Sequence, residues 1–161
     1  MSNLFETADD GFLDAVKAHA PLLGLDLGDK TIGIAISDVF WSIATPRETI
    51  RRKKFGIDAT ALEAIINTTQ ASALILGLPR NMDGSEGPRC QKTRAFARNF
   101  SQRCPMPILL WDERLSTVAA ERALLEADTS RAKRAEVIDH VAAGYILQGA
   151  LDRIAHIKGH R

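Results

Sequence analysis

Three acidic residues stand in apolar surroundings, where a charged side chain is costly to bury. Asp26 lies within the run 22–28, Glu113 follows the run 108–111 directly, and Asp139 belongs to a long apolar helical pattern. A buried carboxylate without a partner costs several kcal/mol or becomes protonated, so each of these acids needs a cation or a hydrogen-bond donor nearby.

Each acid also has an ordinary structural explanation. Asp26 could accept a hydrogen bond from a turn amide, Glu113 could belong to a polar loop, and the helix dipole favours an acid such as Asp139 early in a helix. Asp112 precedes Glu113, and the two side chains of an extended chain point to opposite sides. Only one of them can therefore face the same cavity as Asp26, and the sequence leaves open which one.

Taken together, the three acids predict a divalent-metal site. The carboxyl ends of parallel strands are where α/β sheets place ligands, and carboxylate oxygens suit Mg²⁺ or Mn²⁺. Two such ions about 4 Å apart can hold both oxygens of an in-line phosphoryl displacement, with no catalytic histidine or cysteine. We expect a hydrolase with two Mg²⁺ or Mn²⁺ ions whose catalytic and metal-binding residues are Asp26, Glu113 and Asp139, with Asp112 as the alternative to Glu113.

Positive charge is local in this chain. The 161 residues include 21 basic and 20 acidic side chains, a net charge of +1, which excludes a uniformly basic nucleic-acid coat. Basic residues gather at 51–54, along 80–103 and at 131–134. Two of these runs neighbour the proposed site, so we expect them to attract phosphate groups. The aromatic share of 6% argues against a platform that stacks bases.

Composition favours one globular domain. Apolar residues make up 45% and charged residues 25% of the chain, and its length suits a single domain. Cys90 and Cys104 have neither zinc-site nor disulfide-framework spacing, which fits a reducing cytoplasm. We see neither an export signal nor a membrane span, and expect a cytoplasmic protein.

The order of apolar patterns predicts the fold class. Residues 3–19 favour a net negative helix that Pro21 ends, so we divide the chain into a helical extension (1–20) and one domain (21–158). A meander of three strands follows, with Pro46 placing its third strand near an edge. The predicted strands are 22–28, 31–38, 42–50, 73–77 and 108–111, and the predicted helices are about 57–66, 89–103, 116–126 and 133–157. This order indicates an α/β fold whose mixed five-stranded sheet joins an antiparallel meander to parallel strands and is flanked by helices.

Four segments resemble the YqgF (RuvX) family. They are Gly24-Leu25-Asp26-Leu27-Gly28-Asp29-Lys30-Thr31-Ile32-Gly33-Ile34-Ala35, the stretch 76–85, the stretch 112–117 and the stretch 138–148, and together they cover most of 22–152. The family has an RNase H-like fold, and its members are described as candidate pre-16S rRNA nucleases or Holliday-junction-resolvase-like proteins. The resemblance implies that fold and catalytic acids at Asp26, Glu113 and Asp139.

The resembling segments and the basic loop also carry polar side chains that we expect to contact the substrate: Lys30, Arg80, Asn81, Arg89, Arg114, Ser116 and Thr117. One departure concerns the strand that ends in Gly77. Many RNase H-like resolvases resemble one another in carrying an acid there, and this chain has none. The second acid must therefore come from the next strand, as Glu113 or Asp112.

The resulting hypothesis is a metal-dependent endonuclease that acts on structured RNA, at the immature end of the small-subunit rRNA in ribosome biogenesis. The alternatives are a resolvase of branched DNA and a non-catalytic rRNA-binding assembly factor. An ATP-binding protein of the actin and sugar-kinase type is a further alternative, since Asp26-Leu27-Gly28 also resembles its phosphate loop. That type needs two copies of the fold, and this chain has room for one. We expect nucleic acid and ribosomal particles as partners, no membrane association, and a monomer or weak dimer.

Overall fold

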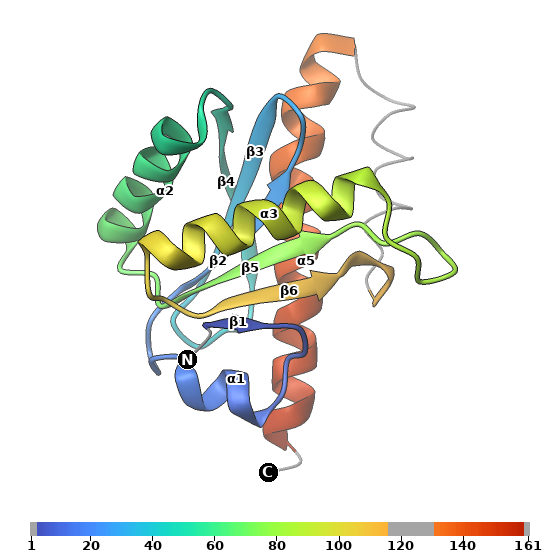
Figure 1. Ribbon diagram of the computed structural model, residues 1–161. Coiled ribbons are helices and arrows are strands. Elements are labelled where there is room, and N and C mark those ends of the chain that lie inside the picture. Colours follow the sequence, from blue (N-terminus) through green and yellow to red (C-terminus); the bar gives the residue numbers. More distant parts are fainter. Residues whose placement is uncertain (1–2, 116–130, 160–161) are drawn as a thin grey trace.

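The computed structural model describes residues 3–115 and 131–159, and for residues 131–139 the backbone alone. A six-stranded sheet has the order β1-β6-β5-β2-β3-β4 and is covered by helices (Figure 1). The strands are β1 (Leu4–Phe5), β2 (Leu22–Leu27), β3 (Thr31–Ser37), β4 (Ala44–Arg51), β5 (Ala73–Leu78) and β6 (Ile108–Asp112). The helices are α1 (Asp10–Ala15), α2 (Phe55–Thr69), α3 (Pro88–Arg103), the 3₁₀ helix η1 (Glu113–Leu115) and α5 (Arg131–Gly159).

The predicted mixed α/β sheet is confirmed. Strands β2, β3 and β4 form the antiparallel meander, and β5 pairs in parallel with both β2 and β6. The tight turn between β2 and β3 is closed by the Gly28 N–H, which donates to the Thr31 carbonyl over 2.8 Å. Strand β4 lies at one edge of the sheet, as Pro46 predicts.

The helix predicted over residues 3–19 is wrong in its extent. Leu4 and Phe5 form a short strand that pairs in parallel with Ile108 and Leu109 of β6, so the sheet has six strands and not the predicted five. Only Asp10–Ala15 is helical, with the Asp9 carboxylate accepting from the Phe12 N–H at its start. A two-residue strand depends on a partner distant in the chain, and local periodicity does not report that partner.

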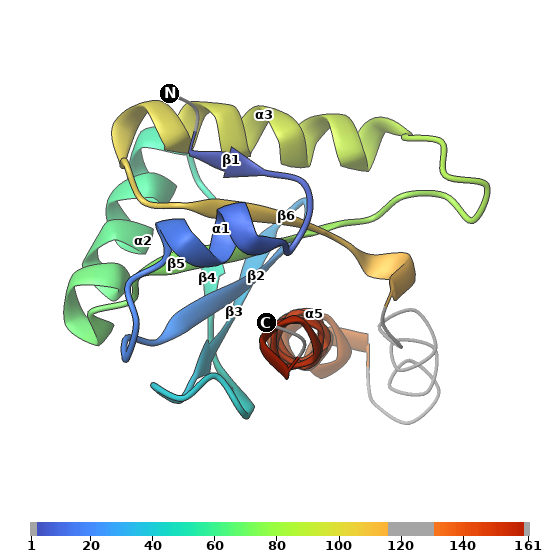
Figure 2. The same cartoon turned by 90° about the horizontal axis from the view of Figure 1, so that it is seen from below.

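Both faces of the sheet are covered by helices. Helices α1 and α5 pack on one face with Leu22, Ile75 and Trp111, while α2 and α3 pack on the other (Figure 2). The alternation in β2 therefore sends Leu23 and Leu25 toward α2 and α3, and sends Asp26 toward α5. A Cβ atom at Gly24 would lie only 2.9 Å from the Ala143 carbonyl of α5, so this close approach of helix and strand requires glycine.

The other predicted elements lie within a few residues of the observed ones, and the helix predicted over 116–126 falls outside the described residues. Helix α5 runs across β2, β3 and β4, which places it over the meander that carries Asp26. In the described part of the chain, every helix is too short or too polar to cross a membrane.

Candidate functional site

Asp26 occupies the carboxyl end of β2 and faces α5. Its side chain is almost completely buried, and its partner in β3 is Gly33, which has no side chain to fill the space beside it. Arg89 approaches from the first turn of α3, with its Nη2 atom 3.9 Å from Asp26 Oδ1. The same Nη2 atom donates to the Leu27 carbonyl over 3.2 Å, so Arg89 also fixes the backbone that follows Asp26.

Glu113 reaches the same face of the sheet from the end of β6. Gly77 of β5 separates the two acids: it lies one position beyond Leu76, which pairs with Leu25, and it pairs with Trp111 of β6. A Cβ atom at Gly77 would lie 3.4 Å from Glu113 Oε1 and 2.4 Å from the Ile146 side chain of α5. Position 77 is a glycine and carries no acidic side chain. The space above it is therefore open to the Glu113 side chain.

Asp112 belongs to the opposite face. Its carboxylate forms an ion pair with Arg114, with Nη2 2.7 Å from Oδ2, and lies 3.8 Å from Arg80 Nη1. The hydrogen bond from Arg114 holds the pKa of Asp112 below its ordinary value. Of the two acids that the sequence left open, the structure brings Glu113, and not Asp112, to the side of Asp26.

Asp139 lies on α5, directly before His140, and its side chain is outside the description. His140 is half-buried, and its Nδ1 atom is 3.2 Å from Thr49 Oγ1 of β4. Among the side chains that are described, no group of three or more His, Cys, Asp or Glu residues is arranged to hold a metal ion. Asp26 and Glu113 do share a face and offer only carboxylate oxygens, a donor set that fits Mg²⁺ or Mn²⁺.

Three residues that we expect to contact the substrate also hold the loop between β5 and α3. Asn81 closes this loop, since its N–H donates to the Ser85 carbonyl over 2.9 Å and its amide to Ser85 Oγ over 3.0 Å. Arg114 Nη1 donates to the Met82 carbonyl over 3.4 Å. Arg80 forms an ion pair with Glu86, with Nη2 3.4 Å from Oε2, in addition to its contact with Asp112. Ser116 and Thr117 fall outside the described residues.

A buried network that the sequence did not predict lies behind the turn that follows Asp26. Asp58 of α2 is 1% exposed, and its Oδ1 accepts from the Lys53 N–H over 2.8 Å. Arg52 Nε lies 3.8 Å from Asp58 Oδ2, and Arg52 Nη1 donates to the Gly28 carbonyl over 2.8 Å. One signal was available: Asp58 stands four residues before Leu62, on the apolar side of the predicted helix.

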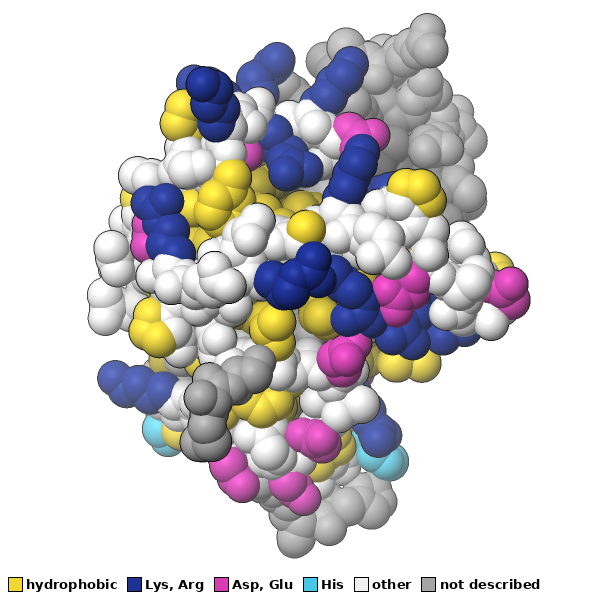
Figure 3. All heavy atoms as spheres, in the orientation of Figure 1, with side chains coloured by type: hydrophobic (Ala, Val, Ile, Leu, Met, Phe, Trp, Pro, Cys, Tyr) yellow, Lys and Arg dark blue, Asp and Glu magenta, His cyan; other side chains and the backbone are white. Residues whose placement is uncertain are grey.

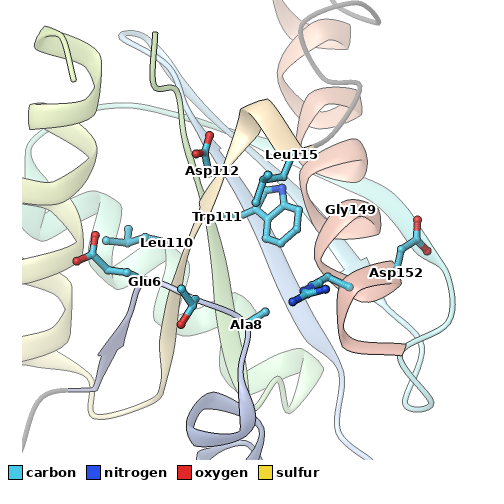
Figure 4. A pocket seen from close by; sticks show the side chains of 10 residues that line it. Glu6, Ala8, Leu110, Trp111, Asp112, Leu115, Gly149 and Asp152 are labelled. Carbon is cyan, nitrogen blue, oxygen red and sulfur yellow. The ribbon is translucent and has the colours of Figure 1, made fainter. Parts of the chain in front are cut away.

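Charge is unevenly distributed over the surface. Figure 3 shows Lys and Arg side chains over the upper part of this face and acidic side chains toward its lower end. Lys30 is exposed in the turn between β2 and β3, where its carbonyl accepts from the Arg52 N–H, and Lys92 lies 3.4 Å from Asp29 of the same turn. The near-neutral net charge therefore conceals a basic surface beside Asp26.

Comparison with known proteins gives the family. Residues 20–153 match the RuvX family, described as Holliday junction resolvase. The chain belongs to the RuvX family. A protein of Ruegeria pomeroyi is 64% identical over 152 residues, which cover 94% of this chain and 98% of that protein. One of Roseobacter denitrificans is 63% identical over 160 residues, covering 98% and 97% of the two chains. Both carry the name "Putative pre-16S rRNA nuclease".

Solved structures confirm the RNase H-like fold of this RuvX-family chain. RuvC of T. thermophilus in complex with a Holliday junction substrate has a TM-score of 0.54 at 10% sequence identity, covering 85% of this chain and 97% of RuvC. The yeast mitochondrial Holliday junction resolvase Ydc2 has a TM-score of 0.52 at 12% identity, covering 91% and 83%. The chain is thus a member of a nuclease family, with Asp26 and Glu113 on one face of its sheet.

Proposed function

We propose that this RuvX-family protein is a divalent-metal-dependent endonuclease that cuts structured RNA, at the immature end of 16S rRNA. The observation that carries the proposal is the placement of Asp26 and Glu113 on one face, on either side of Gly77, at the carboxyl edge of the sheet. The names of the similar Ruegeria and Roseobacter proteins support the choice of substrate. Ribosomal particles in the cytoplasm are the proposed setting.

Asp26, Glu113 and Asp139 would hold the metal, as two Mg²⁺ or Mn²⁺ ions. Metal bound there would supply a nucleophilic hydroxide and stabilise the charge that develops on the phosphoryl oxygens. The chain contributes position: Arg89 and Arg52 each bind a carbonyl of the turn after Asp26, at Leu27 and Gly28. These contacts restrict the backbone on which the Asp26 carboxylate depends.

Substrate phosphates would lie along the basic surface at Lys30 and Arg89. Arg80, Asn81 and Arg114 would act by shaping the loop between β5 and α3, through the contacts to Asp112, Ser85 and Met82. Ser116 and Thr117 remain proposed substrate contacts. Resolution of branched DNA is the second candidate function, favoured by the likeness in fold to RuvC.

The experiment is a hydrolysis assay on a labelled pre-16S RNA fragment and on a matched branched DNA, with Mg²⁺, Mn²⁺ or chelator. Asp26→Asn, Glu113→Gln and Asp139→Asn should each reduce turnover by at least about 100-fold, because metal-assisted charge stabilisation contributes several kcal/mol. Asp112→Asn is the matched control and should keep turnover within a few-fold. Full activity in chelator or in Glu113→Gln would refute the proposal. If only Asp112→Asn lost turnover, Asp112 would be the metal-binding acid in place of Glu113. Faster cleavage of the branched DNA would favour the resolvase.

A further inference from the structure

The basic run 51–54 lies beside the turn that follows Asp26. It leaves β4 and leads into α2, and Figure 1 shows this connection next to the β2–β3 turn at the upper end of the sheet. The Arg52 N–H donates to the Lys30 carbonyl over 2.8 Å, and Arg52 Nη1 donates to the Gly28 carbonyl over 2.8 Å. A run that is distant from Asp26 in the chain therefore lies at the same end of the sheet.

Three lysines at this end of the sheet carry charge that no described acid neutralises. Lys30, Lys53 and Lys54 are exposed and form no ion pair with any described residue. In the basic stretch 80–103, by contrast, three arginines are paired with acids. These are Arg80 with Glu86, Arg94 with Glu86 and Glu6, and Arg103 with Glu63. The three lysines therefore offer a ligand positive charge that the three arginines do not.

A buried acid holds the backbone of the run in place. Asp58 Oδ1 accepts from the Lys53 N–H over 2.8 Å, and Asp58 Oδ2 lies 3.8 Å from Arg52 Nε. Asp58 is 1% exposed, so it fixes the backbone without adding negative charge to the surface. Asp29, an exposed acid of the β2–β3 turn, is paired with Lys92 at 3.4 Å. The result is a fixed backbone with exposed lysines, which suits a rigid polyanion because little conformational freedom is lost on binding.

The distance from Asp26 limits what these lysines can contact. Asp26 pairs with Gly33 and Gly33 with Thr49, so two strand spacings, about 10 Å, separate Asp26 from β4. Lys53 comes four residues after Thr49, about 13 Å further along the strand direction, which is perpendicular to the first. The Lys53 backbone is thus roughly 16 Å from that of Asp26, or about five steps of a nucleic-acid duplex.

We propose that Lys53 and Lys54 bind the phosphates of a double-stranded arm of the RNA substrate, about five base pairs from the phosphate that is cut. Lys30 contacts the same arm closer to the cut. This inference rests on the proposed function for the identity of the polyanion. A duplex keeps its phosphates at a fixed spacing over this distance, whereas a single strand would lose conformational freedom in spanning it. The surface thereby selects an RNA whose cut site adjoins a paired stem.

The test uses two labelled RNA stem-loops with the same loop and the same single-stranded tail, but with stems of about 4 and about 12 base pairs. The shorter stem spans about 14 Å and does not extend from Asp26 to Lys53, whereas the longer one exceeds that distance. Affinity is measured in chelator at several salt concentrations, for the wild type and for Lys53→Gln/Lys54→Gln. Both side chains are exposed and the Lys53 N–H is retained, so this variant keeps the contact to Asp58.

The matched control is Lys17→Gln/Arg153→Gln, which also removes two exposed positive charges. Lys17 follows α1 and Arg153 belongs to the later part of α5, and Figure 1 shows both segments at the end of the molecule opposite the β2–β3 turn. The control should change neither affinity by more than two-fold, because the proposed arm does not extend to that end.

The variant Lys53→Gln/Lys54→Gln should bind the longer stem-loop about 10-fold more weakly at about 0.1 M salt. The slope of log affinity against log salt concentration should fall by about two, one for each phosphate contact. Affinity for the shorter stem-loop should stay within two-fold of the wild type.

Unchanged binding of the longer stem-loop by Lys53→Gln/Lys54→Gln would overturn the proposal. An equal loss for both stem-loops, or the same loss in the control, would also overturn it. Cleavage of the same RNAs with Mg²⁺ is measured separately. Stem-dependent binding without metal-dependent cleavage would remove the proposed function and keep the arm-binding surface, whereas cleavage without stem-dependent binding would do the reverse.

Discussion

Asp26 and Asp58 are buried to nearly the same extent, at 2% and 1% exposed, yet their surroundings differ. Asp58 accepts from a backbone N–H at 2.8 Å and lies 3.8 Å from Arg52, at the start of a helix whose dipole favours an acid. Asp26 lies at a strand end, on the face that Glu113 also reaches, with Arg89 at 3.9 Å. Burial alone therefore does not separate a candidate metal-binding acid from a structural one, whereas the neighbouring groups of the two acids differ.

The two regions are joined through Arg52. Its guanidinium lies between the Asp58 carboxylate and the Gly28 carbonyl, two residues after Asp26. The structural acid thus supports the turn behind the candidate catalytic acid without reaching its face of the sheet. Substitutions at the two positions should accordingly separate stability from chemistry.

The largest stability effect is expected at Asp58. Asp58→Ala leaves the Lys53 N–H and Arg52 without their buried acceptor, and should lower the free energy of unfolding by about 3 kcal/mol. Turnover, measured well below the melting temperature, should stay within a few-fold of wild type. Urea denaturation followed by circular dichroism checks the first value and the RNA cleavage assay the second. Unchanged stability of Asp58→Ala would show that Asp58 does not stabilise the fold. Lost turnover in the folded variant would show that Asp58, like Asp26, is needed for hydrolysis.

The next effect concerns metal-linked stability. Asp26→Asn removes one of the converging negative charges, so in chelator it should melt above the wild type. Mn²⁺ at about 100 times its dissociation constant should stabilise the wild type by roughly 2.7 kcal/mol and Asp26→Asn hardly at all. Asp58→Asn serves as the control, because it should keep the full Mn²⁺ shift from a lower starting temperature.

The measurement is a set of melting curves of the wild type, Asp26→Asn and Asp58→Asn, each with and without Mn²⁺. If Asp26→Asn melts well below the wild type in chelator and Mn²⁺ moves no curve, Asp26 is a structural acid like Asp58. The nuclease hypothesis would then depend on family membership alone.

The smallest effect on stability is expected at Asp38. This acid is exposed, so its hydrogen bonds act on its pKa without the burial that Asp26 and Asp58 share. The Ile43 N–H, at 2.9 Å, and the Ser42 hydroxyl lower the pKa of Asp38 to about 2 from its ordinary 3.8. A lowered folded-state pKa means that this stabilisation is complete above about pH 4 and is lost as the pH falls toward 2. Thermal melting should show less acid destabilisation across this window in Asp38→Asn than in the wild type. Identical pH profiles would contradict the assignment.

The N-terminal region shows where prediction from sequence stopped. The apolar pattern of 3–19 favoured one helix and an extension outside the core. In the structure Phe12 is fully buried in the cluster that contains Leu109 and Ile154. The amphipathic pattern correctly indicated a buried face, but it could not show that Leu4 and Phe5 would pair with β6. Asn3 precedes that strand, and its amide donates to the Met106 carbonyl just before β6, over 2.6 Å.

The order of the elements along the chain indicated the mixed sheet, and Pro46 indicated the edge position of β4. Alternation along one strand is a local property, so the sequence by itself also determined the face shared by Gly24 and Asp26. It also determined that Asp112 and Glu113 point apart. Only the tertiary structure decided which of these two meets Asp26, because the answer depends on the register of β6 against β5 and on the room above Gly77. The contact from Arg52 to Gly28 likewise joins residues distant in the chain, whose distance packing alone sets.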